Sequence, residues 1–133
     1  MKNITIVNNN ISLIDPGVID EVPQLEDLNL SSNNIENLPK ELFKKLNQLK
    51  TLNLSDNKLQ SFICELLPLN NVITEFHINN NDLEKISLAN SRYLKKVKII
   101  DFTYNICIDF KYGNGKTGRT LPELFLALRA FIV

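Results

Sequence analysis

Only a few side chains in this chain of 133 residues could take part in acid–base or nucleophilic chemistry. His77 is the only histidine, Asp101 stands 24 positions after it, and Ser55 is the hydroxyl that an architecture of this period would bring nearest. An imidazole, a carboxylate and a hydroxyl are the parts of a hydrolase site. The hydrolase hypothesis therefore requires elements that place residues 24 apart side by side.

The composition excludes several other kinds of chemistry. Cys64 and Cys107 are the only cysteines, too few for a disulfide framework or a four-ligand zinc site. Lys+Arg and Asp+Glu number 15 each, so no net charge attracts the chain to nucleic acid or anionic membranes. No apolar run reaches the roughly 20 residues of a membrane helix. We therefore predict no cofactor, no metal, no nucleic acid partner and no membrane insertion.

An internal repeat supplies the architecture. Asparagine recurs at positions 9, 33, 57, 81 and 105, always 24 residues apart. An apolar pair with one residue between, such as Leu52 and Leu54, precedes each asparagine and predicts a short strand with two inward side chains. Because this strand returns in the same direction, the repeats should stack into a parallel sheet. The asparagine amide can satisfy backbone groups that the bend after the strand leaves unpaired.

The pattern L-x-x-L-x-L-x-x-N-x-L resembles the leucine-rich repeat family over residues 1 to about 110. Leu38, Pro39, Phe43 and Leu46 match the tail of the 24-residue "typical" subclass, which the resemblance associates mostly with extracellular animal proteins. Residues 105–108 are weakly similar to endings of secreted insect members. The resemblance implies an α/β repeat fold: a right-handed solenoid with a short-stranded parallel sheet on its concave face. The convex segments are irregular, so we expect extended or 3₁₀ structure there.

A single domain, 1–133, accommodates these features. We divide it into repeats 1–24, 25–48, 49–72, 73–96 and 97–110, a glycine-rich basic loop at 111–120, and a terminal segment at 121–133. A capping box, Thr120 and Glu123, favours a terminal helix over the last repeat. A degenerate sixth repeat, with Arg129 at the asparagine place, stays open. Met1 occupies the first leucine position, so we expect a fragment or an N-terminal end covered by a partner.

The outward strand positions and the residues just beyond them carry acidic and polar side chains but no lysine or arginine. A concave sheet of one charge sign favours an oppositely charged partner, and tyrosine is enriched at energetic hot spots. We predict a non-catalytic module that binds a protein or peptide with a basic patch. The candidate contact residues are Asp27, Asn29, Thr51, Asn53, Asp56, Glu75, His77, Asn79, Ile99, Asp101, Thr103 and Tyr104.

Two further hypotheses stay beside this one, namely the hydrolase and a cytoplasmic structural or regulatory subunit that packs through its uncapped end. Four Asn-x-Ser/Thr sequons, at Asn3, Asn10, Asn29 and Asn53, would carry glycans if the chain were extracellular. The repeat pattern itself also generates such triplets. Glycans on Asn29 and Asn53 would cover the proposed binding face. The oligomeric state and the identity of the partner stay open.

Overall fold

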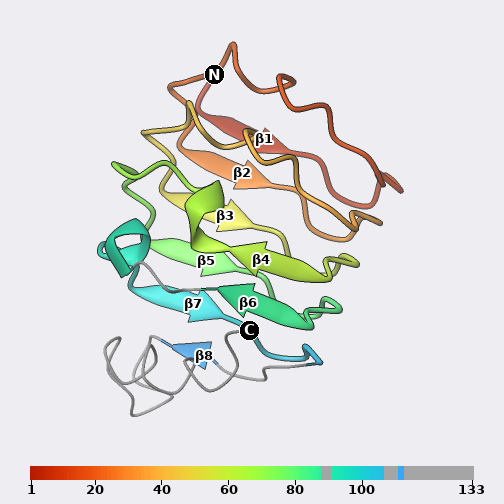
Figure 1. Ribbon diagram of the computed structural model, residues 1–133. Helices are drawn as coiled ribbons and strands as arrows, with labels where there is room; N and C mark the ends of the chain where they lie inside the picture. The colour runs from red at the N-terminus through yellow and green to blue at the C-terminus, as the bar shows by residue number, and fades with distance from the viewer. Residues whose placement is uncertain (88–90, 107–110, 113–133) are drawn as a thin grey trace.

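Each apolar pair of the repeat forms one short strand of a common sheet. The computed structural model describes residues 1–87, 91–106 and 111–112 (Figure 1). The parallel strands are β1 (Asn3–Thr5), β2 (Asp27–Asn29), β3 (Thr51–Asn53), β5 (Glu75–His77) and β7 (Ile99–Asp101). At one edge, β8 (Lys111–Tyr112) pairs antiparallel with β7.

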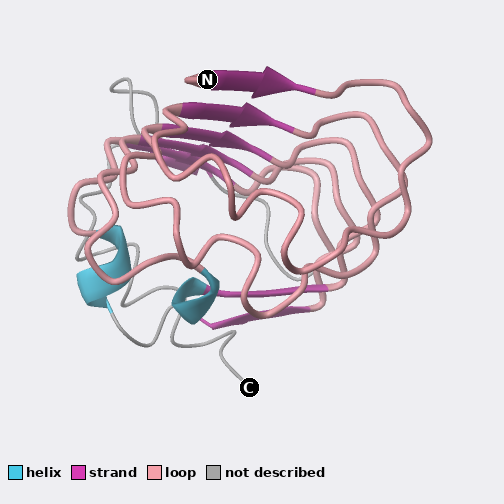
Figure 2. Ribbon diagram, turned by 90° about the horizontal axis from the view of Figure 1, so that it is seen from above, coloured by secondary structure: helices cyan, strands magenta, loops and turns pink. Residues whose placement is uncertain are grey.

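The register of the sheet follows the 24-residue period without a slip. Leu28 pairs with Leu52, Leu52 with Phe76, and Phe76 with Ile100. The five parallel strands line one side of the coil (Figure 2). The chain is thus a repeat solenoid with a short-stranded parallel sheet, the architecture that the sequence predicts.

The opposite side of the coil holds irregular and extended segments. Strands β4 (Ser61–Ile63) and β6 (Lys85–Ser87) form a separate parallel pair, away from the main sheet (Figure 2). Two 3₁₀ helices follow them, η1 (Cys64–Leu66) and η2 (Ser91–Leu94). Within the described residues there is no α-helix, so the expectation of extended and 3₁₀ convex segments is confirmed there.

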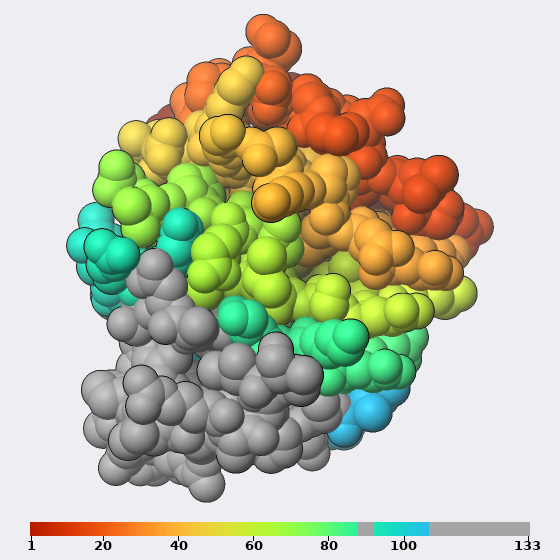
Figure 3. Space-filling view, in the orientation of Figure 1, coloured from red at the N-terminus to blue at the C-terminus, as the bar shows by residue number. Residues whose placement is uncertain are grey.

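A continuous apolar core fills the coil between the sheet and the convex segments. Four phenylalanines are almost completely buried in it: Phe43, Phe62, Phe76 and Phe102. The rings of Phe62 and Phe76 join adjacent repeats, with centroids 5.0 Å apart at an interplanar angle of 44°. Because each repeat packs on its sequence neighbours, the repeats appear as successive bands on the surface (Figure 3).

The asparagine column closes the bend after each strand. The side-chain nitrogen of Asn57 donates to the carbonyls of Leu30, Leu54 and Ser55 at 3.0–3.2 Å, and its oxygen accepts from the N–H of Ile35 at 3.0 Å. Asn33, Asn81 and Asn105 make the same set of bonds in their own repeats. No buried side-chain nitrogen or oxygen in the described residues lacks a partner.

One position that recurs in every repeat takes a left-handed conformation beside this column, and the first repeat adds a second such residue, Asn10, at φ 55°. The residues at the recurring position are Asn8, Ser32, Asp56, Asn80 and Tyr104, with φ between 53° and 60°. Positive φ turns the chain away from the strand, and asparagine and aspartate tolerate it better than bulky residues do. Tyr104 is therefore the residue least suited to this shared backbone conformation.

Several predictions from the sequence concern the C-terminal part of the chain. Lys111 and Tyr112 form strand β8 within the segment predicted as a loop. Cys107, the rest of the loop at 113–120 and the terminal helix or sixth repeat at 121–133 lie outside the described residues.

Candidate functional site

The outer face of the parallel sheet gathers the candidate contact residues in columns. Asp27, Thr51, Glu75 and Ile99 occupy one register column, and Asn29, Asn53, His77 and Asp101 occupy another. Asn79, Thr103, Asp56 and Tyr104 follow the ends of strands β5, β7, β3 and β7. We call these twelve residues the sheet face. The sequence-predicted columns are thus brought together, but their side chains differ in accessibility.

Three side chains of the sheet face accept hydrogen bonds within the turns that follow their own strands. The Oδ1 atom of Asn53 accepts from the N–H of Ser55 at 3.0 Å and from its hydroxyl at 2.7 Å. Asn29 with Ser31, and Asp101 with Thr103, repeat this geometry. Asp101 is only 7% exposed. The structure therefore does not present this carboxylate as an open contact, in contrast to that of the exposed Asp56.

The parts of the hydrolase hypothesis do not assemble into a nucleophilic site. The hydroxyl of Ser55 donates to Asn53, and Ser55 is buried. The Nε2 atom of His77 lies 3.7 Å from Glu75 Oε2 on the same strand. A general base must reach the proton of its nucleophile, and this serine proton is already committed to an amide oxygen.

The accessible part of the sheet face is acidic and aromatic. Asp56 is exposed, and its carboxylate accepts a 2.5 Å hydrogen bond from the side chain of Asn80. The side chain of Glu75 is 47% exposed, and Tyr104 is 75% exposed. These three side chains can reach a partner without any change in the fold.

A charged column, missed in the sequence analysis, borders the sheet face. It consists of the residues just before the strands: Lys2, Glu26, Lys50, Thr74 and Lys98. Glu26 bonds both Lys2, at 2.6 Å, and Lys50. Hydrogen bonds from Lys2 and then Lys50 lower the pKa of the Glu26 carboxyl from 4.5 to about 2. The same 24-residue period could have revealed this column, had the positions before the strands been aligned.

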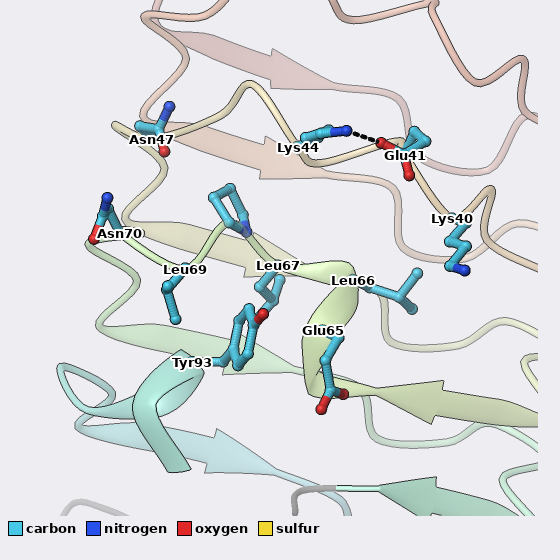
Figure 4. Close-up of a pocket in the computed structure, with 11 residues that line it drawn as sticks. Lys40, Glu41, Lys44, Asn47, Glu65, Leu66, Leu67, Leu69, Asn70 and Tyr93 are labelled. Carbon is cyan, nitrogen blue, oxygen red and sulfur yellow. Dashed lines mark ion pairs between the residues drawn. The ribbon is translucent and has the colours of Figure 1, made fainter. Parts of the chain in front are cut away.

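Two hollows lie away from the sheet face. One, of about 330 Å³, opens at the N-terminal end between repeats 1 and 2 and is lined by ten apolar residues and Asp15. The other, of about 270 Å³, lies on the convex side, where Leu66, Leu67 and Tyr93 meet Lys40 and Lys44 (Figure 4). In Figure 4, Lys44 pairs with Glu41 at the rim of this convex hollow. One of the two lysines that line the hollow is therefore already neutralised by a carboxylate.

A parallel sheet, a buried asparagine column and stacked neighbouring repeats define a repeat solenoid, a class that presents extended surfaces for binding. The model of the family "Leucine rich repeat" matches residues 1–62, so the first part of the chain is similar to leucine-rich repeats. A solved chain from the crystal structure of a TLR13–ssRNA13 complex shares the fold, with a TM-score of 0.64 and 24% identity. That match covers 76% of this chain and 14% of the other, so this chain spans a small part of that receptor's length.

No curated protein sequence matches the chain. In the described residues, no helix has the length and apolar character needed to cross a membrane. The same residues contain no group of three or more histidine, cysteine or acidic side chains placed to hold a metal ion.

Proposed function

We propose that the chain is a non-catalytic binding module whose sheet face binds a protein or peptide with a basic patch. The observation that carries this proposal is the accessible triad of Asp56, Glu75 and Tyr104 on a sheet face without lysine or arginine. Two carboxylates attract a cationic partner, and an exposed tyrosine supplies apolar contact area at its edge.

The spacing of the contact residues fits an extended partner. Glu75 lies at the start of β5 and Tyr104 follows β7, so a bound segment would cross adjacent strands. Ile99 pairs with Glu75 in register and adds a half-buried apolar side chain between them. A lysine or arginine flanked by apolar residues would match this surface, because its stem packs on apolar groups while its head meets a carboxylate.

Single-stranded RNA accompanies the similar receptor in its crystal structure, which makes RNA the competing partner class. Binding to a phosphate backbone relies on lysine and arginine contacts, and the sheet face has none. Of the three lysines of the bordering column, Lys2 and Lys50 are already paired with Glu26, and Lys98 is exposed before β7. Charge therefore favours a basic peptide over RNA on this face.

The test compares defined probes on matched variants. Fluorescence anisotropy would measure binding of a lysine- and arginine-rich peptide, a glutamate-rich peptide of equal length and a single-stranded RNA. We expect the basic peptide alone to bind, with affinity reduced about tenfold or more by Glu75→Lys and by Tyr104→Ala. Glu84→Lys makes the same charge change at an exposed position off the sheet face and should leave binding unchanged. Equal affinity in Glu75→Lys, or tighter binding of the RNA, contradicts the proposal.

We further propose an extracellular location, supported by the sequons. The side chains of Asn29 and Asn53 accept backbone hydrogen bonds in the turns after their strands, whereas Asn3 and Asn10 are exposed at the N-terminal repeat. Expression through a eukaryotic secretory route should give a glycan at Asn3 or Asn10, seen as a mass shift that a glycosidase removes. Secretion without any glycan, or retention in the cell, favours the cytoplasmic subunit hypothesis instead.

A further inference from the structure

The N-terminal end of the solenoid is an open apolar surface. Four large apolar side chains are exposed there: Met1 is 70% exposed, Ile6 37%, Leu13 87% and Val18 62%. Ile6, Leu13 and Val18 line the hollow of about 330 Å³, together with Leu28 and Leu30 of the second repeat. Contiguous exposed apolar surface marks an interaction site in a soluble protein.

The same end carries an unpaired strand edge. In β2, the N–H of Asp27 and the carbonyl of Asn29 bond back to the preceding repeat, at Lys2 and Ile6. Asn3 pairs in register with Asp27, and Thr5 with Asn29. The N–H and carbonyl groups of Asn3 and Thr5 therefore point away from β2. Within the described residues they have no hydrogen-bond partner.

We propose that this end binds a second copy of the chain, with β1 pairing antiparallel to β1 of the partner. This inference goes beyond the proposed function, because it concerns a surface at the end of the solenoid and not the sheet face. Two-fold dimers are the commonest closed assemblies, and their interfaces are self-complementary.

Two-fold pairing centred on Ile4 satisfies the open edge completely. Asn3 would stand opposite Thr5 of the second copy, and Thr5 opposite Asn3. In an antiparallel sheet each such pair exchanges two N–H···O bonds, so all four open groups of each copy would be used. The two-fold axis keeps both apolar interiors on one side of the joined sheet, so the exposed Leu13 and Val18 surfaces would face each other.

The charge of this end permits identical surfaces to meet. Asp15 is the single ionisable side chain that lines the hollow, and Lys2 is held by Glu26 at 2.6 Å. Asn3 and Thr5, which would lie across the two-fold axis, are uncharged. A self-association surface must lack strong like-charge repulsion, because each charge meets its own copy.

Sedimentation equilibrium of the unglycosylated 133-residue chain tests the proposal. Thr5→Pro removes the outward N–H but leaves the bonds to β2 in place, since proline is tolerated at strand edges. Leu13→Glu adds a charge to an exposed side chain, and Leu69→Glu makes the same change at an exposed convex position, 46% open. We expect dimers for the wild type and for Leu69→Glu, and a loss of about tenfold or more in association for both other variants.

Circular dichroism melting would show that Thr5→Pro and Leu13→Glu remain folded. A wild type that stays monomeric throughout the micromolar range overturns the proposal and assigns the surface to a different chain. Dimers that persist in both Thr5→Pro and Leu13→Glu overturn it as well. Peptide binding by Leu13→Glu reports on the sheet face alone, so failure of the dimer and failure of the proposed function are distinguishable.

Discussion

The side-chain oxygen of Asn57 accepts a 3.0 Å hydrogen bond from the backbone N–H of Ile35, 22 residues earlier in the chain. Through this bond, an asparagine of one repeat closes the bend of the repeat before it. Its nitrogen reaches back in the same way to the carbonyl of Leu30. The polar interior of the solenoid is thus shared between neighbours, and no repeat is complete alone.

Asn57→Ala should destabilise the protein by about 1–3 kcal/mol, because it leaves buried N–H and carbonyl groups unpaired. Asn9 is the matched control. It holds the same place in the first repeat, but it is exposed and its side chain donates only to Val7. Urea unfolding should show a clearly smaller loss for Asn9→Ala. Equal losses for the two variants contradict a stabilising role for the buried bonds.

Phe76→Ala should cost about 3–5 kcal/mol, since it removes a fully buried ring that packs on Phe62. Leu13→Ala, at a position 87% exposed, should change the free energy of unfolding by less than about 0.5 kcal/mol. Thermal and urea unfolding check both values. A small loss for Phe76→Ala would mean that the two repeats do not share one core.

Stability should depend on pH through Glu26. Its pKa is lowered from 4.5 to about 2 in the folded protein, so its ion pairs stabilise fully above about pH 4.5. This contribution is lost as the pH falls toward 2, because the carboxyl then becomes protonated. The difference in unfolding free energy between the wild type and Glu26→Gln should shrink over that interval. It should also shrink in high salt, since the pairs are partly solvent-exposed. A constant difference from pH 5 to pH 2 contradicts this assignment.

Tyr104→Asn should move stability and binding in opposite directions. The left-handed backbone at φ 57° disfavours a bulky residue, whereas asparagine occupies the equivalent place, Asn80, in the preceding repeat. We expect a gain of up to about 1 kcal/mol in unfolding free energy, together with weaker binding of the basic peptide. Calorimetry and anisotropy measure the two effects separately. Loss of stability in this variant would show that the tyrosine side chain supports the fold.

Asp101→Asn should leave the fold intact, because asparagine fills the equivalent place at Asn29 and Asn53 with the same turn bonds. Asp101→Ala removes the acceptor of the Thr103 bonds and should cost about 1–3 kcal/mol. Guanidinium unfolding distinguishes the two variants. Similar losses for both would show that the charge, and not the turn, accounts for the contribution of Asp101.

The period of the sequence was sufficient to predict the strands, their register and the asparagine column. It could not predict accessibility, because alternation places Asp101 on the outer side of the sheet without showing that this residue is buried. The hydroxyl two residues later was the available signal: Ser31, Ser55 and Thr103 each donate to the residue two before. This turn also explains two of the sequon triplets, at Asn29 and Asn53, without glycosylation.

The charged column that borders the sheet face was missed for a different reason. Aligning only the outward strand positions left out Lys2, Glu26 and Lys50, which stand one place earlier and bond along the solenoid. Nor could composition show that four exposed apolar residues gather at one end, since Leu13 and Val18 belong to a segment with little regular pattern. Both features depend on how neighbouring turns fit in space.

The asparagine bonds between repeats all run one way, from a later repeat to the bend of an earlier one. Damage to one asparagine should therefore loosen the bend of its own repeat and of the repeat on its N-terminal side, while the repeat on its C-terminal side keeps its bonds. Hydrogen exchange along the chain would show this polarity as lost protection in those two repeats and retained protection in the repeat on the C-terminal side. A local defect in the solenoid therefore affects the neighbouring repeat on one side only.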